Sequence, residues 1–324
     1  MYILSSNVKI FRGGVRALIA CLIAFTVVFI QIKVEAFADI VASVEYYDRD
    51  EGVIKTVSAE DVGDTVTTWG DGSSTNPKWY VVKEAVTIND RITVTGNVHL
   101  ILADKAALTA KKGIDVSAGN SLTIYAQTDM LTENTGKIAA TTSDYNAGIG
   151  GSKDKDGGSI KITGGDVKAS SKFGAGIGGG QRGAGGSIKI TGGKVDANSD
   201  DGGAGIGGGT GGAAGSFSTG PDGKALIETN SISDTSDEAD WKGIIFQGGR
   251  GKVYGEQELS YDFSVGGGHT LEIPSGGKLT IPQGKTLELN HGTKLENNGT
   301  LENNGKIKKR KSSENNRKRN YRKR

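Results

Sequence analysis

Histidines are the residues of this chain best suited to acid–base chemistry, and they are widely separated. His99, His269 and His291 have no nucleophile partner within reach by sequence. Cleavage of glycosidic bonds or acidic polysaccharides would need clustered carboxylates, or a basic residue beside a metal, on one face. The carboxylates are scattered, so we predict no catalytic residue and a protein that is not an enzyme. A β-helix polysaccharide lyase or glycoside hydrolase is the alternative.

Short glycine and aspartate motifs could suggest a cofactor or a metal. Residues 174–179 and 203–208 both read G-x-G-x-x-G, but the dinucleotide-binding fingerprint needs a helix after the glycines, and glycine-rich turns follow here. Residues 154–157 and 200–202 carry aspartates that could bind Ca²⁺. Calcium-binding repeats place an aspartate in every glycine-rich turn, and the GIGGG turns contain none. We predict no cofactor and no metal site.

Aromatic residues near acidic loops form the remaining candidate site. Trp241 lies in an acidic stretch beside Asp240, and Tyr254 and Tyr261 follow. Such rings can stack on sugars, so we predict that these four residues bind a ligand. Packing of a cap or lateral loop is the alternative, and both interpretations stay open. Trp69 and Trp79 are expected to seal the first coil, because the end of a repeat array exposes apolar surface.

Glycine content indicates the kind of scaffold that must position these residues. The chain of 324 residues has 52 glycines and only 4 prolines. Dense glycine implies many tight turns or close backbone approaches. A collagen-like chain is excluded because no strict Gly-X-Y register exists, and disorder is disfavoured because Ile, Val and Leu recur at regular offsets.

A repeat of about 28 residues runs through the middle of the chain. GGSIKITGG starts at Gly157 and Gly185, and AGIG starts at Ala147, Ala175 and Ala204. Each repeat predicts three short strands, whose alternation turns one set of residues inward. The predicted inward residues are Ile160, Ile162, Val167, Ala169 and Ile177 in one repeat, and Ile188, Ile190, Val195, Ala197 and Ile206 in the next. The fold class is therefore all-β, a parallel β-helix with three short strands per coil.

A second, shorter periodicity follows an interruption. Leu271, Leu279, Leu287 and Leu295 fall eight residues apart, and Leu301 and Ile307 continue in steps of six. Each unit predicts a strand with two inward residues and a turn, so three units would make one coil of 24 residues.

Several motifs together resemble a recurrent type of cell-surface protein from Gram-positive, mainly clostridial, gut bacteria. The similarity covers about residues 65–307. The motifs are TWGDG at 68–72, WYVV at 79–82, ITVTGNVHLILAD at 92–104, the GAGIGGG and GGSIKITGG repeats, and the terminal LTIPQG and LENNGTLENNG. The resemblance implies a pectin-lyase-like, right-handed β-helix and an adhesin-like role, and it supplies no active-site motif.

The first 38 residues are typical of a secretory signal peptide. A basic leader precedes the apolar run 17–32, and Ala36-Phe37-Ala38 predicts cleavage after Ala38. An uncleaved signal anchor is the alternative. Only in that case would we expect the protein to be attached to the membrane. Cys21 completes a lipobox-like motif, but most of the apolar run follows it, so we expect it to be removed with the leader. The mature chain would then have no disulfide.

The net charge of +2 is unevenly distributed along the chain. It divides into +3 for residues 1–38, −11 for residues 39–305 and +10 for residues 306–324. Because phosphate contact needs a basic surface, we expect no nucleic acid to bind the folded body. The basic end could bind anionic wall polymer, phospholipid or nucleic acid, or result from a frameshift.

These observations predict a secreted or cell-surface, non-catalytic, adhesin-like monomer that contacts an extracellular glycan or cell-wall polymer. A structural module of a truncated larger surface protein is a further alternative. The predicted divisions are a signal peptide at 1–38, a leader or cap at 39–78, a β-helix at 79–225, an irregular acidic insertion at 226–262, eight-residue-repeat coils at 263–307 and a basic disordered tail at 308–324.

Overall fold

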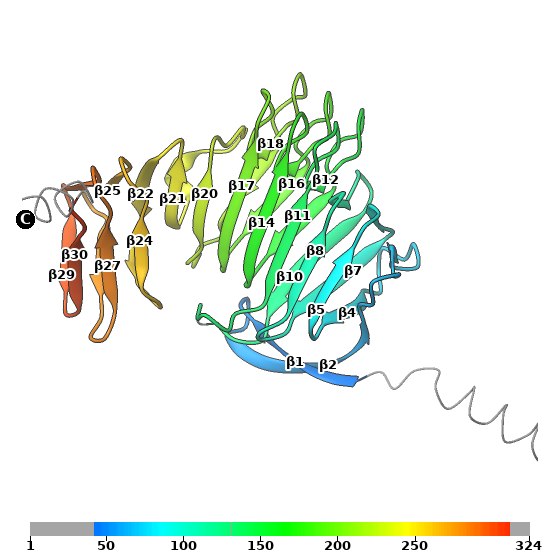
Figure 1. The fold of residues 1–324 in the computed structure, drawn as a ribbon, viewed down its shortest axis with the longest axis horizontal. Coiled ribbons are helices and arrows are strands. Elements are labelled where there is room, and N and C mark those ends of the chain that lie inside the picture. The colour runs from blue at the N-terminus through cyan, green and yellow to red at the C-terminus, as the bar shows by residue number, and fades with distance from the viewer. Residues whose placement is uncertain (1–41, 130, 312–324) are drawn as a thin grey trace, which may run out of the picture. The chain divides into compact units, whose positions relative to one another are not determined.

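Short strands stack into sheets in the computed structural model, which describes residues 42–129 and 131–311 (Figure 1). Sheet 1 has the order β1 (Ala42–Asp48), β2 (Val53–Asp61), β4 (Lys78–Val82), β7 (Asn97–Leu102), β10 (Ser121–Ala126), β13 (Ser159–Ile162), β16 (Ser187–Ile190) and β19 (Ser216–Ser218). Sheet 2 has the order β5 (Ala85–Ile88), β8 (Ala107–Ala110), β11 (Lys137–Thr141), β14 (Asp166–Ser171), β17 (Lys194–Ser199), β20 (Leu226–Thr229), β21 (Gly243–Gln247), β22 (Arg250–Tyr254), β25 (Thr270–Ile273) and β28 (Lys294–Asn297).

The remaining strands of the described residues form three smaller sheets. Sheet 3 consists of β3 (Thr68–Trp69), β6 (Ile92–Val94), β9 (Ile114–Asp115), β12 (Ile149–Gly150), β15 (Ile177–Gly178) and β18 (Ile206–Gly207). Sheet 4 consists of β23 (Glu256–Glu258), β26 (Lys278–Ile281) and β29 (Thr300–Asn303), and sheet 5 of β24 (Phe263–Val265), β27 (Thr286–Leu289) and β30 (Lys306–Lys309). A 3₁₀ turn, η1, spans Glu238–Asp240.

The first solenoid, residues 68–247, is a parallel β-helix with three strands in each complete coil. The chain visits sheets 1, 2 and 3 in turn, and each strand pairs in parallel with its equivalent in the next coil, as Ile160 with Ile188 and Val167 with Val195. All ten residues predicted to point inward are at most 1 % exposed. The fold class predicted from the repeat is therefore confirmed.

The second solenoid, residues 250–309, is built from the eight-residue units. Leu271 pairs with Leu295, Leu279 with Leu301, and Leu287 with Ile307, so equivalent residues lie 24, 22 and 20 positions apart. The predicted coil of 24 residues is found on the first side. The two following sides are shorter because the last turns follow the six-residue step.

The two solenoids meet in sheet 2, where strand direction reverses. From β2 onward, neighbouring strands of the described residues run parallel, except that β21 and β22 form an antiparallel hairpin. Ile227 and Ile245 continue the inward column of the first solenoid. Leu226, Ile244 and Phe246 lie on the opposite face of the same sheet, because neighbouring side chains of a strand alternate between faces.

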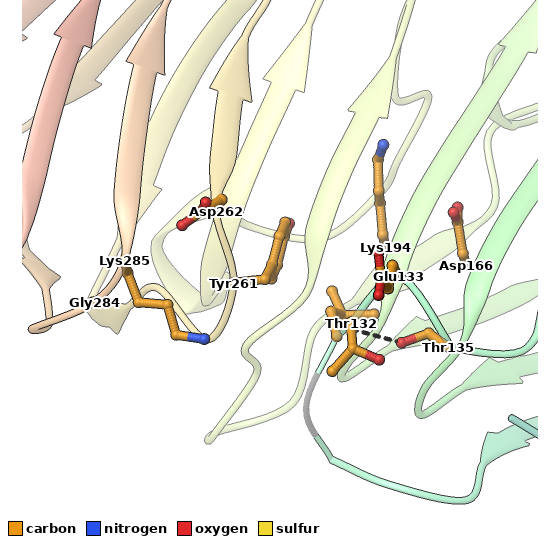
Figure 2. A pocket seen from close by; sticks show the side chains of 10 residues that line it. Thr132, Glu133, Thr135, Asp166, Lys194, Tyr261, Asp262, Gly284 and Lys285 are labelled. Carbon is orange, nitrogen blue, oxygen red and sulfur yellow. Dashed lines mark hydrogen bonds between the residues drawn. The ribbon is translucent and has the colours of Figure 1, made fainter.

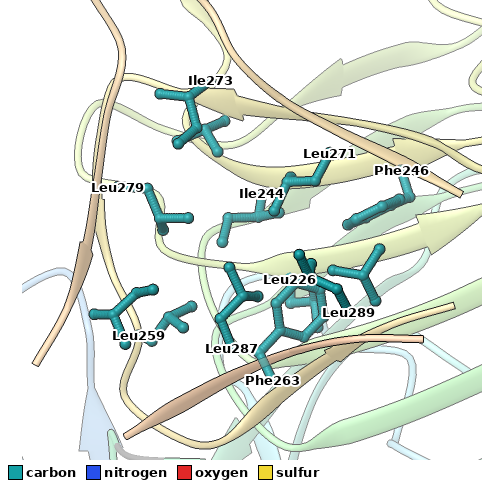
Figure 3. Close-up of a cluster of buried hydrophobic side chains, with 13 residues drawn as sticks. Leu226, Ile244, Phe246, Leu259, Phe263, Leu271, Ile273, Leu279, Leu287 and Leu289 are labelled. Carbon is teal, nitrogen blue, oxygen red and sulfur yellow. The ribbon is translucent and has the colours of Figure 1, made fainter. Parts of the chain in front are cut away.

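The outer face of sheet 2 becomes the inner face of the second solenoid. Ile244 and Phe246 belong to one buried cluster with Val253, Leu271 and Leu279 (Figure 3). Since strand direction and core side reverse together, the chain winds with the same hand in both solenoids. The two cores therefore lie on opposite faces of one continuous sheet, sheet 2.

The N-terminal residues form a hairpin-like extension of sheet 1 rather than a cover for its end. Tyr46 of β1 packs its ring 4.9 Å from Trp79 and 4.8 Å from Tyr125. Arg49 donates from Nε to the carbonyl of Thr163 at 3.0 Å, so this extension lies across the outer face of sheet 1. Trp69 is fully buried at the start of sheet 3, whereas Trp79 lies under the extension, on the outer face.

Several predicted divisions differ from the observed strands. The stretch 226–262, predicted to be irregular, contains β20–β23, because its apolar residues serve two cores. The predicted tail begins inside β30, which pairs with β27 up to Lys309. The predicted signal peptide, its cleavage after Ala38 and the lipobox lie outside the described residues. Within 42–129 and 131–311, no helix is long and apolar enough to cross a membrane.

Candidate functional site

The change of core from one face of sheet 2 to the other leaves a groove beside the second solenoid. This junction groove has a volume of about 590 Å³. It is lined by Leu131, Thr132, Glu133, Thr135, Asp166, Lys194, Tyr261, Asp262, Gly284 and Lys285 (Figure 2). One wall is the outer face of sheet 2, another is formed by turns of the second solenoid, and residues 131–135, which precede β11, line the third side.

The wall from sheet 2 carries a charge of each sign. Asp166 and Lys194 are the first residues of β14 and β17 and are register partners. Both point away from the first core, because Val167 and Val195 beside them point into it. Neither side chain has an ion pair or hydrogen bond among the described residues, so both are free to meet a ligand.

The wall from the second solenoid provides an aromatic ring, Tyr261, next to the carboxylate of Asp262. Tyr261 packs 6.4 Å, ring to ring, from Phe263 of β24, and burial raises the pKa of its hydroxyl. Asp262 accepts a hydrogen bond from the backbone amide of Thr286 at 2.7 Å, which fixes its carboxylate. Figure 2 shows Tyr261 and Asp262 on one side and Lys194 and Glu133 on the other.

Glu228 lies on the same outer face of sheet 2, next to the core of the second solenoid. Its register partner on β21 is Phe246, so an apolar cluster lies beside the carboxyl. Burial raises its pKa, and the positive charge of Lys194 opposes that shift. The carboxyl also interacts electrostatically with Tyr261, which places it close to the groove. A raised carboxyl pKa near a cleft marks a candidate site residue.

Of the four residues predicted to bind a ligand, Trp241 and Tyr254 pack together with Asp240 beside them, and Tyr261 lies in the junction groove. Trp241 is 4 % exposed, with its ring 5.0 Å from Phe217 and 5.5 Å from Tyr254. The Tyr254 hydroxyl donates to Glu238 at 3.0 Å. These contacts cover the last coil of the first solenoid, as in a cap, while Asp240 is exposed on η1. Tyr261 alone of the four lines the junction groove.

Candidate metal and cofactor motifs have structural partners instead. Asp154 pairs with Arg182 at 2.5 Å, and Asp156 accepts from the Ala184 amide at 2.7 Å. Across residues 42–129 and 131–311, no group of three or more His, Cys, Asp or Glu side chains could hold a metal ion. The glycines of 174–179 and 203–208 surround β15 and β18, and the element that follows each is a strand.

Comparison with known proteins identifies the repeat and nothing finer. A family described as beta helix repeat matches residues 160–181 and 188–212, which cover most of two consecutive coils, β13–β15 and β16–β18. No curated protein and no solved structure is significantly similar to the chain. The matched coils are those in which the 28-residue repeat is most regular.

Proposed function

We propose that this β-helix protein is an exported, non-catalytic surface protein that binds carbohydrate in the junction groove. The observation that supports this most is Tyr261, whose ring lines the groove beside the unpaired side chains of Asp166 and Lys194. A sugar has an apolar face and a rim of hydroxyls. An aromatic ring contacts the first, while carboxylates and ammonium groups exchange hydrogen bonds with the second.

This proposal assigns carbohydrate binding to a different place from the aromatic cluster predicted from the sequence. Trp241 and Tyr254 pack against each other at the end of the first solenoid, so carbohydrate contact is assigned to Tyr261 together with groove residues that lie far from it in sequence. Grooves that join two structural units are frequent ligand sites, because they offer concave surface with converging polar groups.

A glycan array probed with the full-length protein tests the proposal. We expect binding to at least one class of extracellular polysaccharide, and we expect Tyr261→Ala to weaken it about tenfold, the effect of losing one stacking contact. Tyr145→Ala is the matched control, because Tyr145 is 43 % exposed and is not part of the groove. Failure of every glycan to bind would favour the alternative of a structural module.

Polysaccharide cleavage is the second candidate, and Glu228 is the observation that favours it. A carboxyl whose pKa is raised by burial could act as a general acid beside the groove. Incubation with acidic and neutral polysaccharides, followed by an assay for new reducing ends, distinguishes the two. We expect none to be released. Release that is lost in Glu228→Gln would establish an enzyme in place of a binding protein.

Export is proposed from the leader. Fractionation of the producing cells should place the protein outside the cytoplasm, and sequencing of its N-terminus should begin at Asp39. A mature chain that retains Met1 in the membrane fraction would instead indicate an uncleaved anchor.

A further inference from the structure

Three charged side chains form a column on the outer face of sheet 2. Lys137, Asp166 and Lys194 are the first residues of β11, β14 and β17, and the strand register places them side by side. Their charges alternate in sign from one coil to the next. We refer to these three residues as the charge column.

Cross-strand ion pairing is the simplest explanation for alternating charges, and it applies to the neighbouring column. There, Lys168 and Asp196 approach to 4.0 Å. In the charge column, no ion pair or side-chain hydrogen bond joins Lys137, Asp166 or Lys194 to any described residue. Their charges are therefore available to a partner outside the chain.

The charge column leads into the junction groove. Asp166 and Lys194 line it, and Tyr261 and Lys285 lie on the opposite wall. Neighbouring strands are about 4.8 Å apart, so the sign changes at each step of about 4.8 Å and the same charge returns after roughly 10 Å. One strand spacing is close to the rise of one sugar ring in an extended polysaccharide, and two are close to a disaccharide.

We propose, building on the carbohydrate-binding function, that the ligand is a linear polysaccharide in which a carboxylate-bearing sugar and an amine-bearing sugar alternate. The polymer lies along the solenoid axis over the charge column. Its carboxylates meet Lys137 and Lys194, its ammonium group meets Asp166, and one sugar ring packs on Tyr261. A polymer with one sign of charge would place a repelled group at every second strand.

The test measures the affinity of the full-length protein for polymers of matched length. De-N-acetylated hyaluronan alternates glucuronate with glucosamine, hyaluronan carries only the carboxylate, and chitosan carries only the amine. We expect the alternating polymer to bind at least about tenfold more tightly than either, because one charge-assisted hydrogen bond contributes about a factor of ten. Asp166→Ala and Lys194→Ala should each remove about that factor.

Lys189→Ala is the matched control, since Lys189 is an outward residue of β16 in sheet 1. It should leave binding unchanged, and all variants should keep the wild-type melting temperature. Equal affinity for hyaluronan or chitosan, or binding that is insensitive to Asp166→Ala, would overturn the charge-column assignment. So would equally tight binding of an alternating Lys-Glu peptide.

The two proposals fail in different ways. Glycan binding that depends on Tyr261 but shows no preference for the alternating polymer would leave the carbohydrate-binding function in place and overturn only the ligand class. Absence of binding to every polysaccharide, with a correctly folded protein, would overturn both.

Discussion

At the scale of single residues, the junction between the solenoids depends on a glycine. Gly251 of β22 lies opposite Phe246 of β21, and a Cβ atom at Gly251 would be 2.3 Å from the Phe246 ring. Phe246 is 2 % exposed and packs into the second core, so its ring has little room to move. The absence of a side chain at Gly251 lets the ring lie across the hairpin.

Gly251→Ala is expected to destabilise the protein by about 1–3 kcal/mol, because an overpacked core must shift its backbone or side chains. Urea denaturation followed by fluorescence measures this change. Gly63→Ala is the control, since a Cβ atom there would meet its nearest neighbour, Val66, at 3.7 Å, an ordinary contact. Equal stability of the two variants would show that Phe246 does not occupy this position.

His99 makes the N-terminal extension sensitive to acid. Its ring lies 4.4 Å from the Trp79 ring and 3.2 Å from the Tyr125 hydroxyl, and burial, followed by the nearby charge of Lys161, lowers its pKa to about 4. The unfolded chain binds a proton at His99 near pH 6.5 and the folded chain only near pH 4. The contribution of neutral His99 to the free energy of unfolding is therefore complete above pH 6.5 and is lost as the pH falls towards 4.

We expect His99→Gln to remove part of the stability difference between pH 7 and pH 4, about 1–2 kcal/mol because the ring is only partly buried. Carboxyl groups that titrate in the same range act equally in both proteins, so the difference between variant and wild type isolates His99. Parallel pH profiles for the two proteins would contradict the buried position.

Site residues were harder to predict from sequence than core residues. Asp166 and Lys194 begin strands of the regular repeat, where an outward charge is ordinary solvation, and nothing local distinguishes them from Lys168. Tyr261 was predicted as a ligand residue for its aromatic ring, not for its place in a groove. The groove forms from five segments between Leu131 and Lys285, so no short motif describes it.

At the scale of strands, buried and outward side chains alternate in the first solenoid. This alternation is lost in β21, at the junction between the two solenoids. Strands such as β13 and β16 bury every second residue, as expected for a sheet with one buried face. In β21, Ile244, Ile245 and Phe246 are all buried, because the strand faces both cores. Consecutive apolar residues in 226–262 were the sequence signal of a strand buried on both sides.

Ile190→Asp tests the inward column of sheet 1. Ile190 is fully buried and pairs with Ile162 of the preceding coil, so an aspartate there would be an unpaired charge in an apolar ladder. We expect a loss of more than about 4 kcal/mol and of cooperative thermal unfolding. Lys189→Asp on the same strand faces outward and should leave the melt nearly unchanged. A cooperative, unshifted melt of Ile190→Asp would contradict the column.

At the scale of the whole described molecule, the second core lies on the outer face of sheet 2. The repeat predicts both solenoids and their strand ladders. It does not predict how they join, because that depends on the antiparallel hairpin of β21 and β22, which has no counterpart in either repeat. The junction groove and the proposed function both follow from this hairpin.

Spin-label distances test this arrangement most directly. Lys194 and Lys285 line the same groove, so spin labels attached to them should be close together. Arg182 lies in the turn after β15 of sheet 3, on another side of the first solenoid. The distance between labels at Lys194 and Lys285 should be clearly shorter than that between Arg182 and Lys285. Equal distances, as expected if the second solenoid continued on the axis of the first, would contradict a second core on the outer face of sheet 2.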